Sequence, residues 1–210
     1  MRAIIFDLDN CLAAADEPGA ALFAPVFAAV RNANHDTLTR DALDSAFRDC
    51  WVHAFDVVAE RHGFSGAMRA AGWRALLDVE VSGPMFGYGD LDQLAGLGER
   101  RFLVTSGFRR LQESKVRALG IAWLFDEVVI DAIDEAEHPG KEQIFLDLMG
   151  RYNLDPADVV VVGDNPESEL AVARRLDLRG VQILRPGVAP AEHVSERVGG
   201  LSELRRLLSA

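Results

Sequence analysis

Two aspartates, Asp7 and Asp9, directly follow a run of apolar residues at positions 3–6. In an extended strand, residues two apart point to the same side, so these two side chains would crowd each other. At about 4 Å and an effective dielectric constant near 20, two negative charges repel by about 4 kcal/mol. We therefore expect the chain to turn here, or a cation to join the two carboxylates.

Further groups that can do chemistry follow three later segments. They are Thr105, Ser106 and Gly107, then Lys141 after Pro139 and Gly140, and then Gly163, Asp164 and Glu169. Small hydroxyls before a helix, together with the free N–H groups of that helix, can receive an anion. A lysine ammonium near another helix start adds positive charge to the same place.

Carboxylates from Asp7 and Asp164 could share one hard divalent cation if their strands are neighbours. Magnesium (Mg²⁺) fits best, because it favours oxygen ligands and needs only one or two carboxylates beside a substrate phosphate oxygen. The backbone carbonyl of Asp9 could supply another ligand and leave its side chain free for proton transfer. Glu169 would then orient a ligand of the cation.

The elements that must position these groups are short apolar runs. Their continuous apolar character is typical of strands covered on both faces. The five predicted strands are Ala3 to Phe6, Phe102 to Thr105, Glu127 to Ile130, Val159 to Val162 and Val181 to Leu184. Helical patterns lie between the later runs, for example Lys141 to Met149, and a terminal helix is expected over Leu201 to Leu208. This alternation predicts an α/β fold with a doubly wound parallel sheet.

A long segment from about residue 13 to 88 has no strand-like run, so it is predicted to be a helical insert. Helical spacing of apolar residues covers 22–30 and again 47–58. Chain-breaking residues at 17–19 and 82–84 are expected to mark where the insert leaves and rejoins the core.

Composition narrows the class of protein. The chain has 210 residues, 49% of them hydrophobic, and 22 basic against 33 acidic residues give a net charge of −11. This balance argues against nucleic-acid and anionic-membrane partners. There is no long apolar run and no signal-like leader, and the two cysteines, Cys11 and Cys50, form no metal-binding spacing. We expect a cytoplasmic protein with reduced thiols.

The order of these motifs resembles the haloacid dehalogenase (HAD) superfamily, whose members are mostly phosphatases. The family's DxDx(T/V) motif is matched by residues 7–11, its small hydroxyl residue by Thr105, its lysine by Lys141, and its GDxxx(x)D motif by residues 163–169. The resemblance implies a Rossmann-like core of residues 1–14 and 88–210 with sheet order 5-4-1-2-3. It also implies that residues 15–87 form a helical cap of the family's type one.

The resemblance implies a magnesium-dependent phosphomonoester hydrolase. Asp7 would attack the phosphorus to form an aspartyl phosphate, and Asp9 would act as acid and then as base. The substrate-binding residues would be Thr105, Ser106, Gly107 and Lys141, of which Thr105 and Lys141 also count as catalytic. The metal ligands would be Asp7, Asp9, Asp164 and Glu169.

Two residues depart from the family pattern. Cys11 stands where the family usually has Thr or Val, and Glu169 stands where many members have Asp. We expect Cys11 to pack under the site as an unreactive thiol, because neighbouring carboxylates raise the pKa of a thiol.

Other functions stay open at this point. A 2-haloacid dehalogenase would need neither magnesium nor a second aspartate, a phosphomutase would pass the phosphoryl group to a sugar hydroxyl, and a non-catalytic phospho-acceptor domain would keep it. The expected partner is a small phosphorylated metabolite, with sugar phosphates, phosphoglycolate and nucleoside monophosphates all open. The chain is expected to be a monomer or a homodimer.

Overall fold

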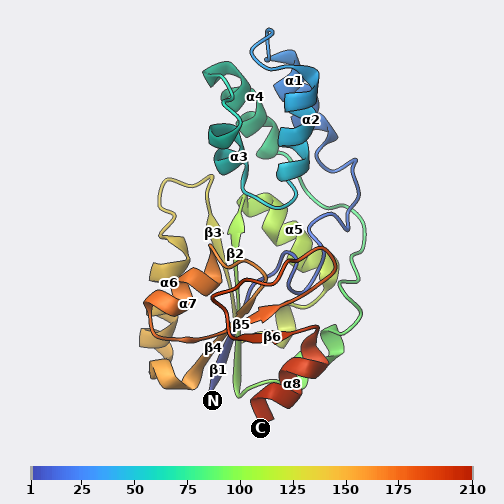
Figure 1. The fold of residues 1–210 in the computed structure, drawn as a ribbon. Coiled ribbons are helices and arrows are strands. Elements are labelled where there is room, and N and C mark those ends of the chain that lie inside the picture. The colour runs from blue at the N-terminus through green and yellow to red at the C-terminus, as the bar shows by residue number, and fades with distance from the viewer. Residues whose placement is uncertain (1, 210) are drawn as a thin grey trace.

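The computed structural model describes residues 2–209, and within them the chain forms one parallel sheet flanked by helices (Figure 1). Its strands are β1 (Ala3–Phe6), β2 (Arg100–Gly107), β3 (Glu127–Ala132), β4 (Val159–Gly163), β5 (Arg179–Ile183) and β6 (Glu196–Val198). The strand order is β3-β2-β1-β4-β5-β6, and every neighbouring pair is parallel. The predicted α/β fold and the order of the first five strands are confirmed.

The sixth strand, β6, was not predicted. It is only three residues long, and of these Val198 alone is buried. Glu196 instead forms an ion pair with Arg179 of the neighbouring strand, with Nε and Oε2 2.6 Å apart. A short edge strand of this kind has no continuous apolar run from which sequence reasoning could detect it.

Eight α-helices accompany the sheet in residues 2–209. They are α1 (Ala24–Asn32), α2 (Arg40–Asp49), α3 (Phe55–Arg61), α4 (Gly66–Leu76), α5 (Arg109–Leu119), α6 (Gly140–Tyr152), α7 (Glu169–Arg175) and α8 (Leu201–Ser209). Short 3₁₀ turns occur at Leu91–Gly96, Ala122–Leu124 and Pro156–Asp158. The helices predicted from 141 and from 201 are confirmed.

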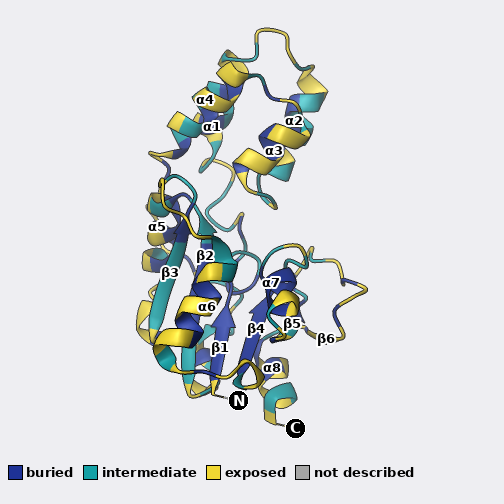
Figure 2. Ribbon diagram, turned by 90° about the vertical axis from the view of Figure 1, so that its left-hand side faces the viewer, coloured by how far each residue is buried: buried dark blue, intermediate teal, exposed yellow. Residues whose placement is uncertain are grey.

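Both faces of the sheet are covered, which explains the continuous apolar strands. Successive residues of β1 enter different cores: Ile4 packs with residues of α5 and α8, and Ile5 packs with residues of α6 and α7. Figure 2 shows β1 and β4 as buried, and they are the two central strands of the sheet. The carboxyl ends of these two strands therefore lie at the centre of the sheet edge.

Helices α1 to α4 lie between β1 and β2 in the chain and contribute most residues of one hydrophobic cluster. We call them the helical insert. Figure 1 places the insert above the carboxyl ends of the strands. Phe108 and Leu111, at the start of α5, belong to the same cluster and connect the insert to the core.

The continuous helix predicted over 47–58 is wrong. Helix α2 ends at Asp49, and α3 begins only at Phe55 after a turn. Ala54 has an extended backbone, with φ −60° and ψ 147°, which no α-helix accommodates. The apolar spacing therefore joins side chains from two helices and a connector, among them Trp51, whose ring packs on Phe23 at 4.6 Å between centroids.

None of the helices within residues 2–209 is both long and apolar enough to cross a lipid bilayer. Met1 and Ala210, the outer ends of the predicted core segments, lie outside the described residues.

Candidate active site

Three carboxylates gather at the carboxyl ends of β1 and β4. Asp7 follows β1, Asp164 follows β4, and the two strands are paired in parallel with Phe6 opposite Val162. Glu169 is the first residue of α7 and is almost fully buried. One oxygen from each of the three side chains lies within 4.8 Å of the others. The structure thus brings together Asp7, Asp164 and Glu169, as the motif spacing predicted.

Lys141 joins this cluster from the first turn of α6. Its Nζ lies 2.7 Å from Oδ1 of Asp7 and 2.8 Å from Oε2 of Glu169. All three side chains are buried, so the ion pairs are poorly screened by water. The predicted lysine is therefore in direct contact with the first aspartate.

Burial changes the protonation of these acids. Desolvation is the largest effect on Asp7 and raises its pKa to about 7, although Lys141 opposes this rise and Glu169 adds to it. Desolvation, followed by the charges of Asp7 and Glu169, raises the pKa of Asp164 to about 8. For Lys141, burial alone would lower the pKa, but Asp7 and Glu169 raise it overall. The single ammonium of Lys141 therefore does not offset the negative charge of the three carboxylates.

This donor set suits a hard divalent cation. Three carboxylates against one ammonium leave two formal negative charges, and carboxylate oxygens are the ligands that Mg²⁺ prefers. Gly163 makes room for the arrangement, because a Cβ there would lie 2.1 Å from Oε1 of Glu169. The same Oε1 accepts a hydrogen bond from the N–H of Asn165 at 2.8 Å.

Asp9 does not belong to the cluster of Asp7, Asp164 and Glu169. Asn10 adopts a left-handed backbone, with φ 54°. The Asp9 carboxylate contacts α5 instead: Lys115 donates to Oδ1 at 2.6 Å and to Oδ2 at 2.8 Å, and Gln112 donates to Oδ2 at 3.2 Å. The two aspartates of the first motif thus have separate partners.

Gln112 is held in one orientation by its own contacts. Its Nε2 donates to Asp9 and to the carbonyl of Ser106, at 3.2 and 3.4 Å. Its Oε1 is the one buried side-chain oxygen or nitrogen that lacks a hydrogen-bond partner in the described chain. Such an atom costs about 1–3 kcal/mol. The orientation that lets Gln112 donate to Asp9 therefore leaves its oxygen unpaired, which lowers the free energy of unfolding.

The hydroxyl segment at the end of β2 lies on the same side of the sheet. Thr105 is buried in β2, and Ser106 Oγ donates to Oδ2 of Asp131 at 3.0 Å. The other oxygen of Asp131 accepts from the N–H of Gly140 at 3.0 Å. Asp131 therefore ties the end of β2 to the start of α6, and thereby fixes the residue before Lys141.

Cys11 is buried beneath these side chains, as predicted. Its Sγ lies 3.7 Å from the carbonyl oxygen of Val162 in β4. Burial, together with the charges of Asp7 and Asp164, raises the pKa of this thiol well above its ordinary value. The departure from Thr or Val therefore leaves a neutral, packed side chain at this position.

Sequence reasoning missed Gln112, Lys115 and Asp131. The first two are polar residues on the buried face of α5, three positions apart, beside apolar Leu111 and Val116. A lysine among apolar positions of a helix was the available signal. Asp131 is the last residue but one of β3, and Asp7 directly follows β1, so both lie at the carboxyl end of a strand. This common position was its signal.

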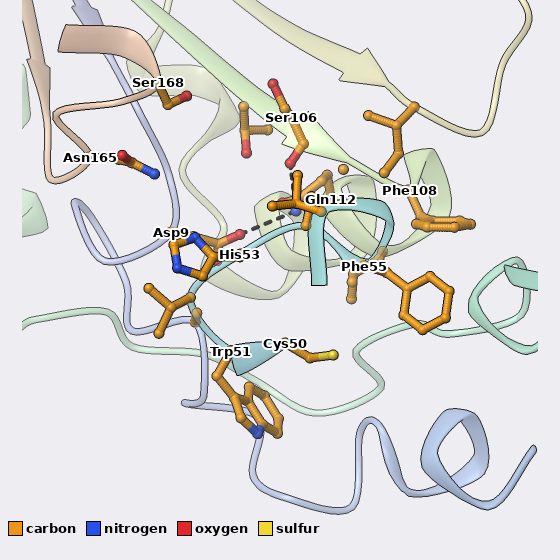
Figure 3. Close-up of a pocket in the computed structure, with 18 of the residues that line it drawn as sticks. Asp9, Cys50, Trp51, His53, Phe55, Ser106, Phe108, Gln112, Asn165 and Ser168 are labelled. Atoms are coloured by element: carbon orange, nitrogen blue, oxygen red, sulfur yellow. Dashed lines mark hydrogen bonds between the residues drawn. The ribbon is translucent and has the colours of Figure 1, made fainter. Parts of the chain in front are cut away.

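A cavity of about 360 Å³ connects these groups with the helical insert. Asp7, Asp9, Thr105, Ser106, Gly107, Lys141, Asp164 and Glu169 all line it. Figure 3 shows Asp9, Gln112 and Ser106 on one side of it and Trp51, Cys50 and Phe55 of the insert on the other. Every residue predicted for the site thus lines the same cavity.

A family profile described as haloacid dehalogenase-like hydrolase matches residues 1–177. The chain belongs to this family. As a haloacid dehalogenase-like hydrolase, it matches one curated relative over a limited stretch: glyceraldehyde 3-phosphate phosphatase of Methanopyrus kandleri is 35% identical over 95 residues. These residues are 45% of this chain and 40% of the relative, so the chain matches only two fifths of the relative's length.

Solved structures of other HAD proteins share the whole fold. A HAD phosphatase from Thermococcus onnurineus superposes with a TM-score of 0.63 and 21% identity, over 99% of this chain and 98% of that one. An L-2-haloacid dehalogenase from Xanthobacter autotrophicus, with chloropropionic acid covalently bound, gives 0.59 and 16% identity over 100% and 99%. At these identities the likeness establishes the fold, which phosphatases and dehalogenases have in common.

Proposed function

We propose that this hydrolase is a magnesium-dependent phosphatase that cleaves a small phosphomonoester through an aspartyl phosphate on Asp7. The observation that carries the proposal is the separation of the two aspartates. Asp7 lies in the carboxylate cluster with Lys141. Asp9 lines the same cavity but is paired with a different cation, Lys115. Two carboxyl groups in different surroundings suit two roles, that of nucleophile and that of acid and base.

In this proposal Asp7 attacks the phosphorus, and the bond to the substrate alcohol breaks. Asp9 must bind a proton before this step. It gives that proton to the leaving alcohol and regains one from the water that hydrolyses the aspartyl phosphate. Lys141, Thr105 and the amides of Ser106 and Gly107 bind the phosphoryl oxygens. Phosphoryl transfer depends mainly on such positioning and charge stabilisation.

The residues that would hold Mg²⁺ are Asp7, Asp164 and Glu169, with the backbone carbonyl of Asp9. When bound, the cation would offset the negative charge of the phosphoryl group and of the carboxylates. The raised pKa values of Asp7 and Asp164 support this assignment, because burial and the neighbouring carboxylates outweigh the one nearby ammonium, Lys141, so that a cation would stabilise the ionised acids.

We further propose the division into a core of residues 1–14 and 88–210 and a cap of residues 15–87. The hydrophobic cluster that joins α1 to α4 and the position of the cavity between insert and sheet support it. We also propose that the protein is cytoplasmic, where its two free cysteines would stay reduced.

The test is phosphate release from a panel of phosphomonoesters with magnesium and with a chelator. We expect release that requires magnesium and that Asp7→Asn abolishes. Asp147→Asn, an exposed change on the outer side of α6, is the matched control and keeps the rate. Release that is independent of magnesium, or that survives in Asp7→Asn, would contradict the proposal.

The rival activities give different results in the same preparation. Halide release from a 2-haloacid without added metal would identify a dehalogenase. Transfer of phosphate to a sugar hydroxyl would identify a phosphomutase. A stable phosphorylated protein without turnover would identify a phospho-acceptor domain.

A further inference from the structure

The insert closes the cavity with an apolar wall opposite the proposed phosphoryl site. The lining residues from residues 15–87 are Ala15, Phe23, Val26, Phe27, Cys50, Trp51, Val52, His53, Ala54, Phe55, Val57, Arg61 and Leu76. Apart from His53 and Arg61, they are aliphatic or aromatic side chains and one thiol. From the core, Phe108, Leu111 and Ile133 extend the same surface.

Ring contacts hold this wall in place. Trp51 packs on Phe23 with ring centroids 4.6 Å apart, and Phe108 meets Trp73 edge to face at 4.8 Å. Figure 3 shows the rings of Trp51, Phe55 and Phe108 arranged around the cavity. Rings fixed in this way offer an apolar surface at little cost in side-chain entropy on binding.

Two valines extend this wall to solvent. Val52 is 61% exposed and Val57 is 42% exposed, and both line the cavity. Val52 lies in the connector between α2 and α3, and Val57 lies in the first turn of α3. Apolar side chains grouped beside a pocket with convergent polar groups are typical of a small-molecule site.

The wall offers few partners for a hydroxylated or doubly charged substrate. His53 and Arg61 are the members of this wall with nitrogen-containing polar side chains, and Arg61 is exposed at the end of α3. A sugar pressed against this surface would lose hydrogen bonds to water without replacing them. At about 360 Å³, the cavity is also near the lower end of the usual range of about 300–1,000 Å³ for ligand pockets.

We propose that the alcohol released by this enzyme is compact and largely apolar, an aryl or branched alkyl group rather than a polyhydroxylated sugar. This inference rests on the proposed phosphatase function and names its substrate class. The phosphoryl group lies against Lys141 and Thr105, and the alcohol part contacts Trp51, Phe55 and Phe108.

The test compares benzyl phosphate with glycerol 3-phosphate and with 3-phosphoglycerate. All three are esters of phosphoric acid with aliphatic alcohols, so the comparison reports mainly on the group beyond the ester oxygen. We expect kcat/KM for benzyl phosphate to exceed the other two at least tenfold, which corresponds to about 1.4 kcal/mol. A preference for glycerol 3-phosphate or for 3-phosphoglycerate, or no preference, would overturn the proposal.

Substitutions of two wall residues test whether the preference for benzyl phosphate depends on the apolar wall. Val52→Asp and Val57→Asp each place a charge beside the apolar group, and we expect the benzyl preference to fall about tenfold. Leu77→Asp is the matched control, since Leu77 is an insert residue that is 43% exposed and does not line the cavity. If Val52→Asp and Val57→Asp kept the preference, or if Leu77→Asp reduced it equally, the assignment to this wall would be wrong.

The proposed reaction is tested separately with 4-nitrophenyl phosphate in the same assay. Hydrolysis of this activated ester without a benzyl preference would overturn the substrate class alone. If no phosphate ester were hydrolysed in the presence of magnesium, the phosphatase activity itself would be refuted.

Discussion

The ammonium of Lys115 contacts both carboxylate oxygens of Asp9, at 2.6 and 2.8 Å, while Asp7 two residues earlier is paired with Lys141 at 2.7 Å. Each aspartate of the first motif therefore has a lysine of its own, one from α5 and one from α6. These separate cations offset the charge of each acid, although the charge of Asp9 still contributes to the raised pKa of Asp7.

The first prediction concerns Lys115. Replacing it with Met removes two charge-assisted hydrogen bonds that orient the Asp9 carboxylate. General acid catalysis contributes about 10²–10⁴-fold, so we expect kcat for an alkyl phosphate such as benzyl phosphate to fall about 100-fold. The loss with 4-nitrophenyl phosphate should be smaller, since its leaving group needs little protonation.

The matched control for this substitution is Arg110→Met on the same helix. Arg110 is exposed and is paired with Glu80 on the outside of the protein, with Nε and Oε2 3.0 Å apart. We expect its kinetics to stay unchanged with both esters. Equal losses for the alkyl and the nitrophenyl ester in Lys115→Met would show that Lys115 does not act through Asp9.

The second prediction concerns Gly163. Replacing it with Ala puts a Cβ 2.1 Å from Oε1 of Glu169, and that carboxylate must move. Changing the support of a metal ligand typically costs about 10–100-fold in affinity. We expect the magnesium concentration for half-maximal activity to rise about tenfold or more, and calorimetric titration with magnesium to report the same loss.

Gly180→Ala is the control for this change, because Gly180 lies on the neighbouring strand and a Cβ there meets only ordinary contacts at 3.6 Å. Magnesium dependence should stay as in the unchanged protein. An unaltered magnesium requirement in Gly163→Ala would argue against Glu169 as part of the metal site.

The third prediction concerns pH and stability in a chelator. Folded Asp7 and Asp164 have pKa values raised to about 7 and about 8, whereas the ordinary value is 3.8. Between these values the folded state binds more protons than the unfolded state, so the free energy of unfolding falls as pH rises. Where folded Asp164 is still protonated and the unfolded group is ionised, it contributes a slope of about 1.4 kcal/mol per pH unit.

Urea denaturation at several pH values measures this slope. Asp164→Asn should be less sensitive to pH between about 5 and 7, by about 1.4 kcal/mol per unit. Added magnesium should stabilise the unchanged protein more at high pH than at low pH, because binding requires ionised carboxylates. Identical slopes for the two proteins would mean that Asp164 is not held protonated in the fold.

Much of this arrangement could be predicted from the sequence. Strands such as Val159–Gly163 are continuous apolar runs, and the acids that follow parallel strands must meet at one edge of the sheet. The meeting of Asp7 and Asp164 follows from that topology, and Lys141 and Glu169 join them from the first turns of α6 and α7. At these positions the local sequence pattern agrees with the overall fold, so the pattern was enough to predict where the side chains lie.

The remaining features depend on information that local pattern does not contain. Lys115 reaches Asp9 across 106 residues, so their contact depends on how α5 docks on the sheet. The break between α2 and α3 lies in a segment whose apolar spacing continues through the turn, and the packing of Trp51 on Phe23 stabilises it. In both cases tertiary contacts, rather than propensity, decide the structure.

The most direct measurement of the central claim is chemical trapping of the phosphorylated residue. The protein is mixed with magnesium and 4-nitrophenyl phosphate, quenched during turnover, and treated with borohydride, which reduces an aspartyl phosphate to homoserine. Peptide mass spectrometry should find homoserine at position 7, and only when both the ester and magnesium were present. Turnover without modification at position 7, or with homoserine at position 9 or 164 instead, would contradict the account.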